Sequence, residues 1–286
     1  MKVLVMGASG MAGHVIAKHF VECGSNVYGL TNIPFNAPNS IVCDVLNSKL
    51  LEKTIKGGKF DVIINAIGIL NESADKNKNI AVYLNSYLPH FVASLISNTK
   101  TKLIHMSTDC VFSGEIGNYK ESDFADGATF YDKSKALGEV VDDKNLTFRN
   151  SIIGPDVNKC GIGLFNWFMA QSSTINGFTK AIWSGVSTIT LAKAMQKAID
   201  KNLTGLYHLT NNNTINKLEL LKLFSKHLKG DKITVNKVDG WDVNKSLICT
   251  RNDFDFVVPS YEEMVIEIKE WVVRHKELYP HYEVVS

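Results

Sequence analysis

The sequence has almost no excess of charge, because 31 Lys and Arg residues stand against 29 Asp and Glu residues, for a formal net charge of +2. A surface that binds nucleic acid needs a clear excess of basic side chains, so no nucleic-acid partner is expected. Long apolar runs are missing as well. No window reaches the roughly 18 apolar residues of a membrane span, and the first apolar run breaks at Gly7, too early for a signal peptide. We therefore expect a cytoplasmic protein with no membrane partner.

Disulfide and metal-ligand patterns are missing too. The chain has five scattered cysteines and no C-x-x-C pair, namely Cys23, Cys43, Cys110, Cys160 and Cys249. An odd number of isolated cysteines is typical of free thiols in a reducing compartment. The eight histidines form no H-E-x-x-H motif and no mixed Cys/His spacing, so no metal is predicted. No Pro/Gly-rich linker separates two parts of the chain, so any two lobes should be closely joined.

The first half of the chain alternates short apolar runs with helical patterns. Strands are predicted at residues 2–6, 26–30, 61–66, 102–106 and 146–149, and helices at residues 11–22, 79–97 and 131–141. The runs at 61–66 and 102–106 are continuous rather than alternating, which is typical of strands buried on both faces. Strands that alternate with helices predict an α/β fold with a doubly wound parallel sheet, the Rossmann arrangement.

The pattern changes after about residue 149. Helices are predicted at residues 162–171, 189–200, 218–228 and 261–276, and a strand at 205–209, with more irregular loops between them. We expect a dinucleotide-binding domain over residues 1–150 and mainly a smaller C-terminal substrate lobe over residues 151–286. The lobe is assigned to residues 151–185 and 205–286, and the helix near 189–201 is left open to return to the main sheet.

Residues 7–13 have the sequence GASGMAG, a G-x-x-G-x-x-G spacing directly after a predicted strand and at the start of a helix. Gly7 permits a tight turn, Gly10 lets backbone N–H groups approach a pyrophosphate, and Gly13 lets the helix pack close to the strand. The helix N-terminus then stabilises negative charge. A glycine triplet alone also fits a plain strand–helix turn, but the spacing, the position and the βα pattern together favour dinucleotide binding.

The end of the second predicted strand bears on the choice of cofactor. NAD-specific sites usually place an acid there to accept a hydrogen bond from the ribose 2′-OH, whereas this chain has Thr31 and Asn32. Without an acid to repel a 2′-phosphate, NADP is favoured over NAD. Asp44, after the third strand, is placed to accept from an adenine amine; a solvated loop acid is the alternative.

Tyr131 and Lys135 form a Y-x-x-x-K pair on a predicted helix, where a spacing of four puts both side chains on one face. A phenol has a pKa of about 10, and a neighbouring ammonium lowers that pKa. A tyrosine tuned in this way can protonate a carbonyl oxygen as hydride arrives at its carbon. The alternative is an exposed pair on a helix surface.

Two hydroxyl side chains, Ser107 and Thr108, follow the predicted strand at 102–106. Ligands of open parallel sheets bind beyond the carboxyl ends of the strands. We favour Thr108 over Ser107 as the group that hydrogen-bonds and orients a substrate carbonyl. The glycine loop, the strand-end hydroxyl and Y-x-x-x-K, in this order, predict a nicotinamide-dependent reductase.

These motifs resemble the extended short-chain dehydrogenase/reductases. Within that group STDCVFSG (107–114), YDKSKALGE (131–139) and TFRNSIIGP (147–155) are similar to the dTDP-4-dehydrorhamnose reductase branch. The resemblance covers nearly the whole chain and is most specific over residues 1–155. Further on, GFTKAIWSG (177–185) resembles the substrate lobe of capsule and O-antigen sugar-nucleotide reductases. The resemblance implies that Thr108, Tyr131 and Lys135 are the catalytic triad.

The loop, the strand ends and the resemblance together predict two sets of contacts. The cofactor set, in which the resemblance supplies Asn65, Ala66, Gly68 and the supporting Asn85, is Gly7, Ser9, Gly10, Met11, Gly13, Asn32, Asp44, Asn65, Ala66, Gly68, Asn85, Ser107, Tyr131 and Lys135. The substrate set is Cys110, Asn166, Lys180 and Trp183. Trp183 is the candidate for a ring that stacks on a nucleotide base.

Two positions depart from the pattern of the branch. Asp132 stands where glycine is more usual, a change of little effect if Asp132 faces solvent. Cys110 stands where the plain dehydrorhamnose reductases commonly carry Tyr. Bifunctional epimerase–reductases of related shape use a Cys and a Lys at sugar C3 and C5, and a thiol is a useful base only beside a cation, for which Lys180 is the candidate. The alternative for Cys110 is a small buried apolar side chain.

The predicted function is reduction by NADPH of the C4 carbonyl of a nucleotide-linked 4-keto-6-deoxyhexose, a dTDP- or UDP-sugar, in polysaccharide precursor synthesis. NADP(H) is the expected cofactor, with NAD(H) left open. A bifunctional 3,5-epimerase/4-reductase and a non-catalytic regulatory subunit of the same fold are the alternatives. The expected partner is the nucleotide-sugar substrate, and a homodimer is left open.

Overall fold

Seven parallel strands form the large sheet of the computed structural model, which describes residues 1–35 and 39–285. Their order is β11-β6-β5-β4-β1-β2-β3. The strands are β1 (Lys2–Met6), β2 (Asn26–Thr31), β3 (Ser40–Val42), β4 (Val62–Asn65), β5 (Lys102–Met106), β6 (Leu146–Arg149) and β11 (Gly205–His208). The order reverses direction between β1 and β4, which is the doubly wound Rossmann topology and confirms the predicted fold class.

Helices cover both faces of this sheet, so its strands are buried on both sides. Val3 and Val5 of β1 belong to one apolar cluster, and Leu4 and Met6, which point the other way, belong to a second. Helices α1 (Met11–Glu22) and α8 (Thr188–Asp200) pack on the first face, and α2 (Ser48–Gly58) and α5 (Leu88–Leu95) on the second. Burial on both faces explains the continuous apolar runs of the sequence.

The chain returns to the large sheet after it has entered the smaller lobe. Helix α8 packs against α1 of the large domain, so the helix near residues 189–201 does return to the main sheet. Strand β11 then pairs with β6 in parallel. The assignment of residues 205–209 to the lobe is therefore wrong. The physical reason is that β6 would otherwise be an unpaired edge, and a strand–helix–strand crossover through α8 places β11 on it.

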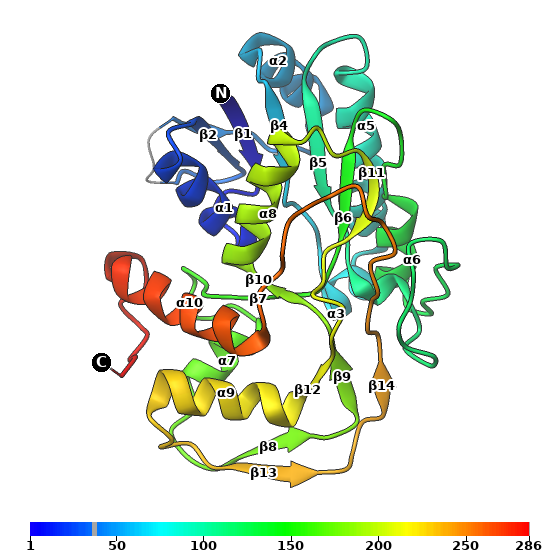
Figure 1. The fold of residues 1–286 in the computed structure, drawn as a ribbon. Coiled ribbons are helices and arrows are strands. Elements are labelled where there is room, and N and C mark those ends of the chain that lie inside the picture. The colour runs from blue at the N-terminus through cyan, green and yellow to red at the C-terminus, as the bar shows by residue number, and fades with distance from the viewer. Residues whose placement is uncertain (36–38, 286) are drawn as a thin grey trace.

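The smaller lobe lies beyond the carboxyl ends of the large sheet's strands (Figure 1). Its three helices are α7 (Leu164–Met169), α9 (Lys217–Lys229) and α10 (Tyr261–Arg274), close to the predicted positions, with a final 3₁₀ turn, η3 (Lys276–Leu278). Its strands are short and form three small sheets: β7 (Ile152–Ile153) with β10 (Val186–Ser187), β8 (Ile175–Phe178) with β13 (Val235–Val238), and β12 (Ile215–Asn216), β9 (Ala181–Trp183) and β14 (Val243–Asn244).

The single helix predicted at residues 79–97 has an irregular middle. After α3 (Asn71–Lys76), the chain forms α4 (Lys78–Ala81), a π-helical turn η1 (Val82–Tyr87) and α5. Pro89, near the start of α5, has no N–H to donate to the carbonyl of Asn85 four residues earlier, and its ring crowds that carbonyl. The wider π turn accommodates the proline, and such turns are frequent at functional sites.

Helix α6 (Phe130–Leu137) ends earlier than the predicted residues 131–141. Its C-cap is Gly138, where a Cβ atom would lie 1.8 Å from the carbonyl oxygen of Asn85. Only a glycine allows this contact between the backbones of η1 and α6. The turn η1 and helix α6 therefore pack backbone against backbone at the end of α6.

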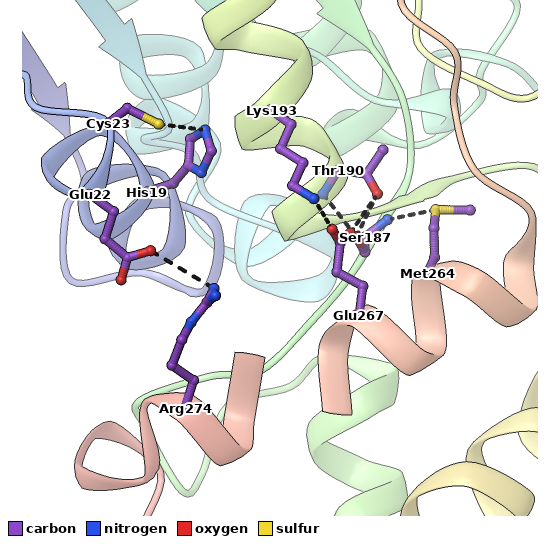
Figure 2. Close-up of polar contacts among 9 residues, drawn as sticks. All are labelled: His19, Glu22, Cys23, Ser187, Thr190, Lys193, Met264, Glu267 and Arg274. Atoms are coloured by element: carbon purple, nitrogen blue, oxygen red, sulfur yellow. Dashed lines mark hydrogen bonds and ion pairs between the residues drawn. The ribbon is translucent and has the colours of Figure 1, made fainter. Parts of the chain in front are cut away.

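Polar contacts fix α10 to the two helices above it (Figure 2). Glu267 accepts hydrogen bonds from Lys193 and Thr190 of α8, and Arg274 Nη2 lies 3.8 Å from Glu22 Oε2 of α1. Beneath them, the apolar cluster of the α1/α8 face continues without a break into α7, α9 and α10. Within residues 1–35 and 39–285, no helix combines the length and the apolar character needed to cross a membrane.

A substitution at Phe224 of α9 can measure how much this shared core contributes to the free energy of unfolding. Phe224 is fully buried, and its ring lies 5.6 Å from the ring of Phe165 and 5.3 Å from that of Phe168. We expect Phe224→Ala to lower the free energy of unfolding by about 3–5 kcal/mol, because it leaves a cavity beside the rings of Phe165 and Phe168. Phe124→Ala is the control: Phe124 is 86% exposed, and its loss should change stability by less than about 0.5 kcal/mol. Denaturant unfolding checks both, and equal effects would contradict the prediction.

Candidate active site

Two adjoining cavities open at the carboxyl ends of the strands. The first, called the loop cavity, has a volume of about 400 Å³ and is lined by Gly7, Ser9, Asn32 and Asp44 among others. The second, called the Tyr131 cavity, has about 430 Å³. Gly10, Ala66, Ile67 and Gly68 line both cavities, so the two share a wall.

The glycine loop has the geometry that its spacing predicted. Gly7 has a φ of +82°, which favours glycine, and its N–H donates to the Leu30 carbonyl at 2.9 Å. A Cβ atom at Gly13 would lie 2.0 Å from the Gly7 carbonyl oxygen, so α1 can approach the loop only because residue 13 is glycine. The loop therefore brings the first turn of α1 up to the cavities.

The far end of the loop cavity carries the residues that bear on the choice of cofactor. Asn32 and Asp44 both line it, and the Thr31 hydroxyl donates to the Ile33 carbonyl at 2.6 Å. Asp44 Oδ1 also accepts from the Leu46 N–H at 3.0 Å. Asp44 thus lines the cavity. Its second oxygen, Oδ2, accepts no hydrogen bond from a backbone N–H of the described residues.

Tyr131 and Lys135 of α6 both line the Tyr131 cavity and are buried. Helix α6 begins with a capping box, in which Thr129 Oγ1 accepts from the Asp132 N–H and Asp132 Oδ2 accepts from the Thr129 N–H, both at 3.1 Å. Asp132 does not face solvent, the condition under which it would have little effect: its side chain is buried because it caps the helix. Asp132 therefore fixes where α6 begins.

Burial dominates the protonation of the pair. It raises the pKa of the Tyr131 phenol, with Cys110 acting in the same direction and the Thr108 hydroxyl against it. Burial also lowers the pKa of Lys135 to about 8, which Glu139 opposes. Lys135 Nζ donates to the Met106 carbonyl at 2.6 Å. The expected lowering of the Tyr131 pKa is wrong for this structure, because lost hydration of the phenol outweighs other effects. Tyr131 stays protonated, the form that a proton donor needs.

Thr108 lies two residues beyond β5 and caps a short 3₁₀ turn, η2 (Asp109–Val111). Its Oγ1 accepts from the Cys110 N–H at 3.1 Å and donates to Asp109 Oδ1 at 3.2 Å. Thr108 and Cys110 both line the Tyr131 cavity. To donate to a ligand, the Thr108 hydroxyl must turn away from Asp109.

The environment of Cys110 does not favour a thiolate. Burial and the neighbouring Asp109 raise the pKa of Cys110 to about 12, although Lys245 acts in the opposite direction. Lys180, the cation expected beside it, is an exposed side chain whose Nζ lies 3.6 Å from Asp242 Oδ2. The charge of Lys217, the first residue of α9, acts on Asp109 and Cys110 instead, and burial lowers the pKa of Lys217 to about 8.

Other predicted residues support the site from behind the cavity walls. Asn65 Oδ1 accepts from the Ile67 N–H at 3.1 Å. Asn85 exchanges two hydrogen bonds of 2.9 Å with the backbone of Ile69 and donates to Ser134 Oγ at 3.0 Å. Both amides are fully buried. Their hydrogen bonds hold the backbone that lines the cavities, and neither side chain lines a cavity itself.

The structure does not bring the remaining predicted substrate residues to the cavities. Asn166 accepts a 2.6 Å hydrogen bond from the Tyr282 hydroxyl and holds backbone carbonyls of the loop before α7. Trp183 is buried against Tyr261, with Lys217 Nζ 5.1 Å from its ring centroid. A ring covered in this way has no free face for a base. Together with the exposed Lys180, these two side chains line neither cavity.

Sequence reasoning missed several side chains that line the Tyr131 cavity, namely Asn71, Asp109, Asn150, Ser151, Asp156 and Ile162. Asn150 stands out because its buried Oδ1 has no hydrogen-bond partner among the described residues. A buried amide oxygen without a partner is costly unless a ligand supplies a donor. The position of Asn150 one residue beyond the carboxyl end of β6 is the signal that could have found it.

The observed geometry fits a dinucleotide. The first turn of α1 has no acidic residue and no side-chain cap, so its N–H groups are available to an anion. At Gly10, a Cβ atom would meet only the Gly7 carbonyl oxygen, 3.4 Å away, so the backbone is open on that side. A pyrophosphate bound at this loop would connect one half of a dinucleotide in the loop cavity with the other half in the Tyr131 cavity.

Comparison with known proteins gives a consistent result. Residues 1–247 match the RmlD substrate binding domain family. The spore coat polysaccharide biosynthesis protein SpsK of Bacillus subtilis is 25% identical over 73% of each chain. The dTDP-4-dehydrorhamnose reductase of Salmonella typhimurium is 26% identical over 75% of this chain and 74% of its own.

The fold agrees as well. A crystal structure of dTDP-4-dehydrorhamnose reductase from Bacillus anthracis, in complex with NADP, has a TM-score of 0.79 and 19% identity over 93% of this chain and 98% of its own. These relatives confirm the predicted resemblance and the enzyme class, an NAD(P)-dependent oxidoreductase. The chain belongs to the RmlD substrate binding domain family.

Proposed function

We propose that this protein uses NADPH to reduce the C4 carbonyl of a nucleotide-linked 4-keto-6-deoxyhexose. The observation that carries the proposal is the meeting of three predicted groups, Thr108, Tyr131 and Lys135, in one cavity that shares a wall with the glycine-loop cavity. A reductase needs this adjacency, because the hydride donor and the acceptor must touch. The names and the family of the relatives point to the same class of substrate.

The nicotinamide, when bound, would supply the hydride. Tyr131 gives its phenol proton to the carbonyl oxygen as the carbon becomes tetrahedral. Thr108 turns its hydroxyl from Asp109 to the same oxygen and so fixes the orientation of the carbonyl. Lys135 keeps a positive charge beside the phenolate that forms at Tyr131 and holds a ribose hydroxyl. Asn150, whose buried Oδ1 has no hydrogen-bond partner in residues 1–35 and 39–285, would accept from a sugar hydroxyl or amide.

Residues 7–13 and the first turn of α1 would hold the pyrophosphate, and Asn32 and Asp44 the adenosine end. NADP is favoured because no acid follows β2 among the described residues 31–35. Residues 36–38, which follow, lie outside the described residues.

A bifunctional 3,5-epimerase/4-reductase is the second candidate. Such an enzyme needs a further acid–base pair. Lys217, rather than Lys180, is the lysine whose charge acts on Cys110, so Cys110 and Lys217 are the candidates for that pair. The raised pKa of Cys110 argues against it, since a thiol that stays protonated is a poor base. A non-catalytic subunit of the same fold is the third candidate. The complete set of Thr108, Tyr131 and Lys135 in the cavity argues against that.

The first prediction concerns the cofactor. NADP⁺ should bind more tightly than NAD⁺, and Asn32→Asp should reverse the preference, because a carboxylate there repels a 2′-phosphate and accepts from a 2′-hydroxyl. We expect a change of about tenfold or more in the ratio of dissociation constants, roughly 1.4 kcal/mol. Calorimetric titration of both proteins with both cofactors measures it. Tighter NAD⁺ binding by the natural protein would refute the preference, and binding of neither would refute the reductase.

The second prediction concerns the proton donor. Tyr131→Phe removes only the phenol oxygen, so folding and NADP⁺ affinity should be nearly unchanged while turnover of a 4-keto-6-deoxy sugar nucleotide falls about 10²–10⁴-fold. Absorbance of NADPH follows the rate. Tyr87→Phe, at an exposed tyrosine of η1, is the matched control and should keep full activity. If the Tyr131 variant stays within a factor of a few of the natural protein, Tyr131 is not the acid.

The third prediction separates one activity from two. We expect a reductase only, so that a sugar nucleotide not yet epimerised, incubated with NADPH in D₂O, gains no deuterium at C3 or C5. NMR of the product shows where deuterium enters. Deuterium there, lost in Cys110→Ser but kept in Cys160→Ser at an exposed cysteine, would establish the bifunctional enzyme instead.

A further inference from the structure

Glu139 is a buried acid to which neither the motifs nor the proposed reduction assigns a role. It follows Lys135 by four residues, just beyond the end of α6, and its side chain is only 8% exposed. Its carboxylate accepts three hydrogen bonds. Arg149 of β6 donates from Nε at 2.8 Å and from Nη2 at 2.6 Å, and the Ser107 hydroxyl donates at 2.6 Å.

Arg149 is itself held from its far side. Its Nη1 lies 3.0 Å from His208 Nε2, and His208 Nδ1 lies 3.0 Å from the Ile248 carbonyl oxygen. Because a carbonyl only accepts, Nδ1 carries the proton and Nε2 accepts from Arg149. Burial lowers the pKa of His208 to about 4, which keeps the ring neutral. The guanidinium also lies over the Phe112 ring, 4.9 Å from its centroid. Arg149 therefore holds Glu139 in one place.

We infer that Glu139 is a positioning residue of the active site, which anchors Ser107 and balances the charge of Lys135. This inference rests on the proposed function. Ser107 and Lys135 both line the Tyr131 cavity. The Glu139 carboxylate thus links the segment after β5, which carries Ser107 and Thr108, to the chain just beyond α6, the helix that carries Tyr131 and Lys135. Its charge is the only acidic one that acts on Lys135 among the described residues.

The groups around Lys135 belong to several elements. Tyr131 precedes Lys135 by one turn of α6, the charge of Lys135 acts on His105 of β5, and Arg149 of β6 is paired with Glu139. The nearby η1 contributes the uncharged Asn85 and Ser86, which bond to Ser134. Burial and Lys135 itself keep the pKa of His105 well below its ordinary value, so His105 is neutral. Glu139 is left as the group that favours the ammonium form of Lys135.

Removal of the Glu139 charge should lower the pKa of Lys135. Lys135 loses its proton as pH rises through its pKa of about 8. Without the Glu139 carboxylate the ammonium is less stable, so the pKa should fall by about one further unit. NMR of protein labelled with ¹³C at the lysine Cε atoms measures this directly, with the signal of Lys135 assigned from Lys135→Met. We expect a lower titration midpoint in Glu139→Gln and a midpoint close to that of the natural protein in Glu139→Asp, which keeps the charge.

Glu267→Gln is the matched control, because Glu267 also accepts from a hydroxyl and a cation, Thr190 and Lys193 (Figure 2), and none of the three lines the Tyr131 cavity. Its Lys135 midpoint should not move. If Glu139→Gln leaves Arg149 unpaired and fails to fold, the double variant Glu139→Gln/Arg149→Met removes both charges, and its midpoint should still be lower. An unchanged midpoint in the folded variant, single or double, overturns the inference.

NADP⁺ affinity is the second readout. If Lys135 must be charged to hold the ribose, Glu139→Gln should bind NADP⁺ about tenfold more weakly at pH 9 and almost equally at pH 6, as a one-unit fall in pKa requires. A natural protein that binds no dinucleotide would refute the proposed function, and the NMR midpoints would still decide the role of Glu139. Lower midpoints with parallel affinity curves would refute the positioning of the ribose through Lys135.

Discussion

A parallel sheet with both faces covered leaves its ligands only the edge where the strands end, and this constraint determines the site. Val3, Val5, Leu4 and Met6 commit β1 to apolar clusters on both sides, so β1 can offer no side chain to a ligand along its length. Polar groups therefore collect beyond the carboxyl ends, where the glycine loop follows β1, Ser107 and Thr108 follow β5, and Asn150 follows β6. The smaller lobe closes over the same edge.

Helix α6 brings Tyr131 and Lys135, the proposed catalytic pair, to that edge, and its two ends are fixed in different ways. The capping box of Thr129 and Asp132 sets the first turn. At the other end the backbone of Gly138 lies against the carbonyl of Asn85, a residue of the π turn η1. Asn85 then reaches back to the loop at Ile69. An irregular turn, a proline and a glycine thus position a pair of side chains that none of them touches directly.

The parts of this site that the sequence predicted are those set by local spacing. GASGMAG, Thr108 after its strand, and Tyr131 with Lys135 depend on residues at most a few positions apart, and the strand and helix periods place them. Asn166, Lys180 and Trp183 depended on the path of the smaller lobe, whose strands have two to four residues and leave too little pattern to follow. Lys217 and Lys245 approach Asp109 from segments more than 100 positions away, and no spacing rule connects them. The capping role of Asp132 was not predicted, because a capping box depends on the exact start of a helix, which is the least certain feature of a sequence pattern.

The return of the chain to the large sheet has a consequence for how the protein is made. Strand β11 and helix α8 are synthesised after β7 to β10 of the lobe, yet they complete the edge beside β6 and the cover over α1. A nascent chain that has emerged only as far as residue 150 would carry an open strand edge and a bare apolar helix face, both of which invite association with other chains. The two lobes are therefore expected to acquire their final structure together, in one cooperative step late in translation, rather than one after the other on the ribosome.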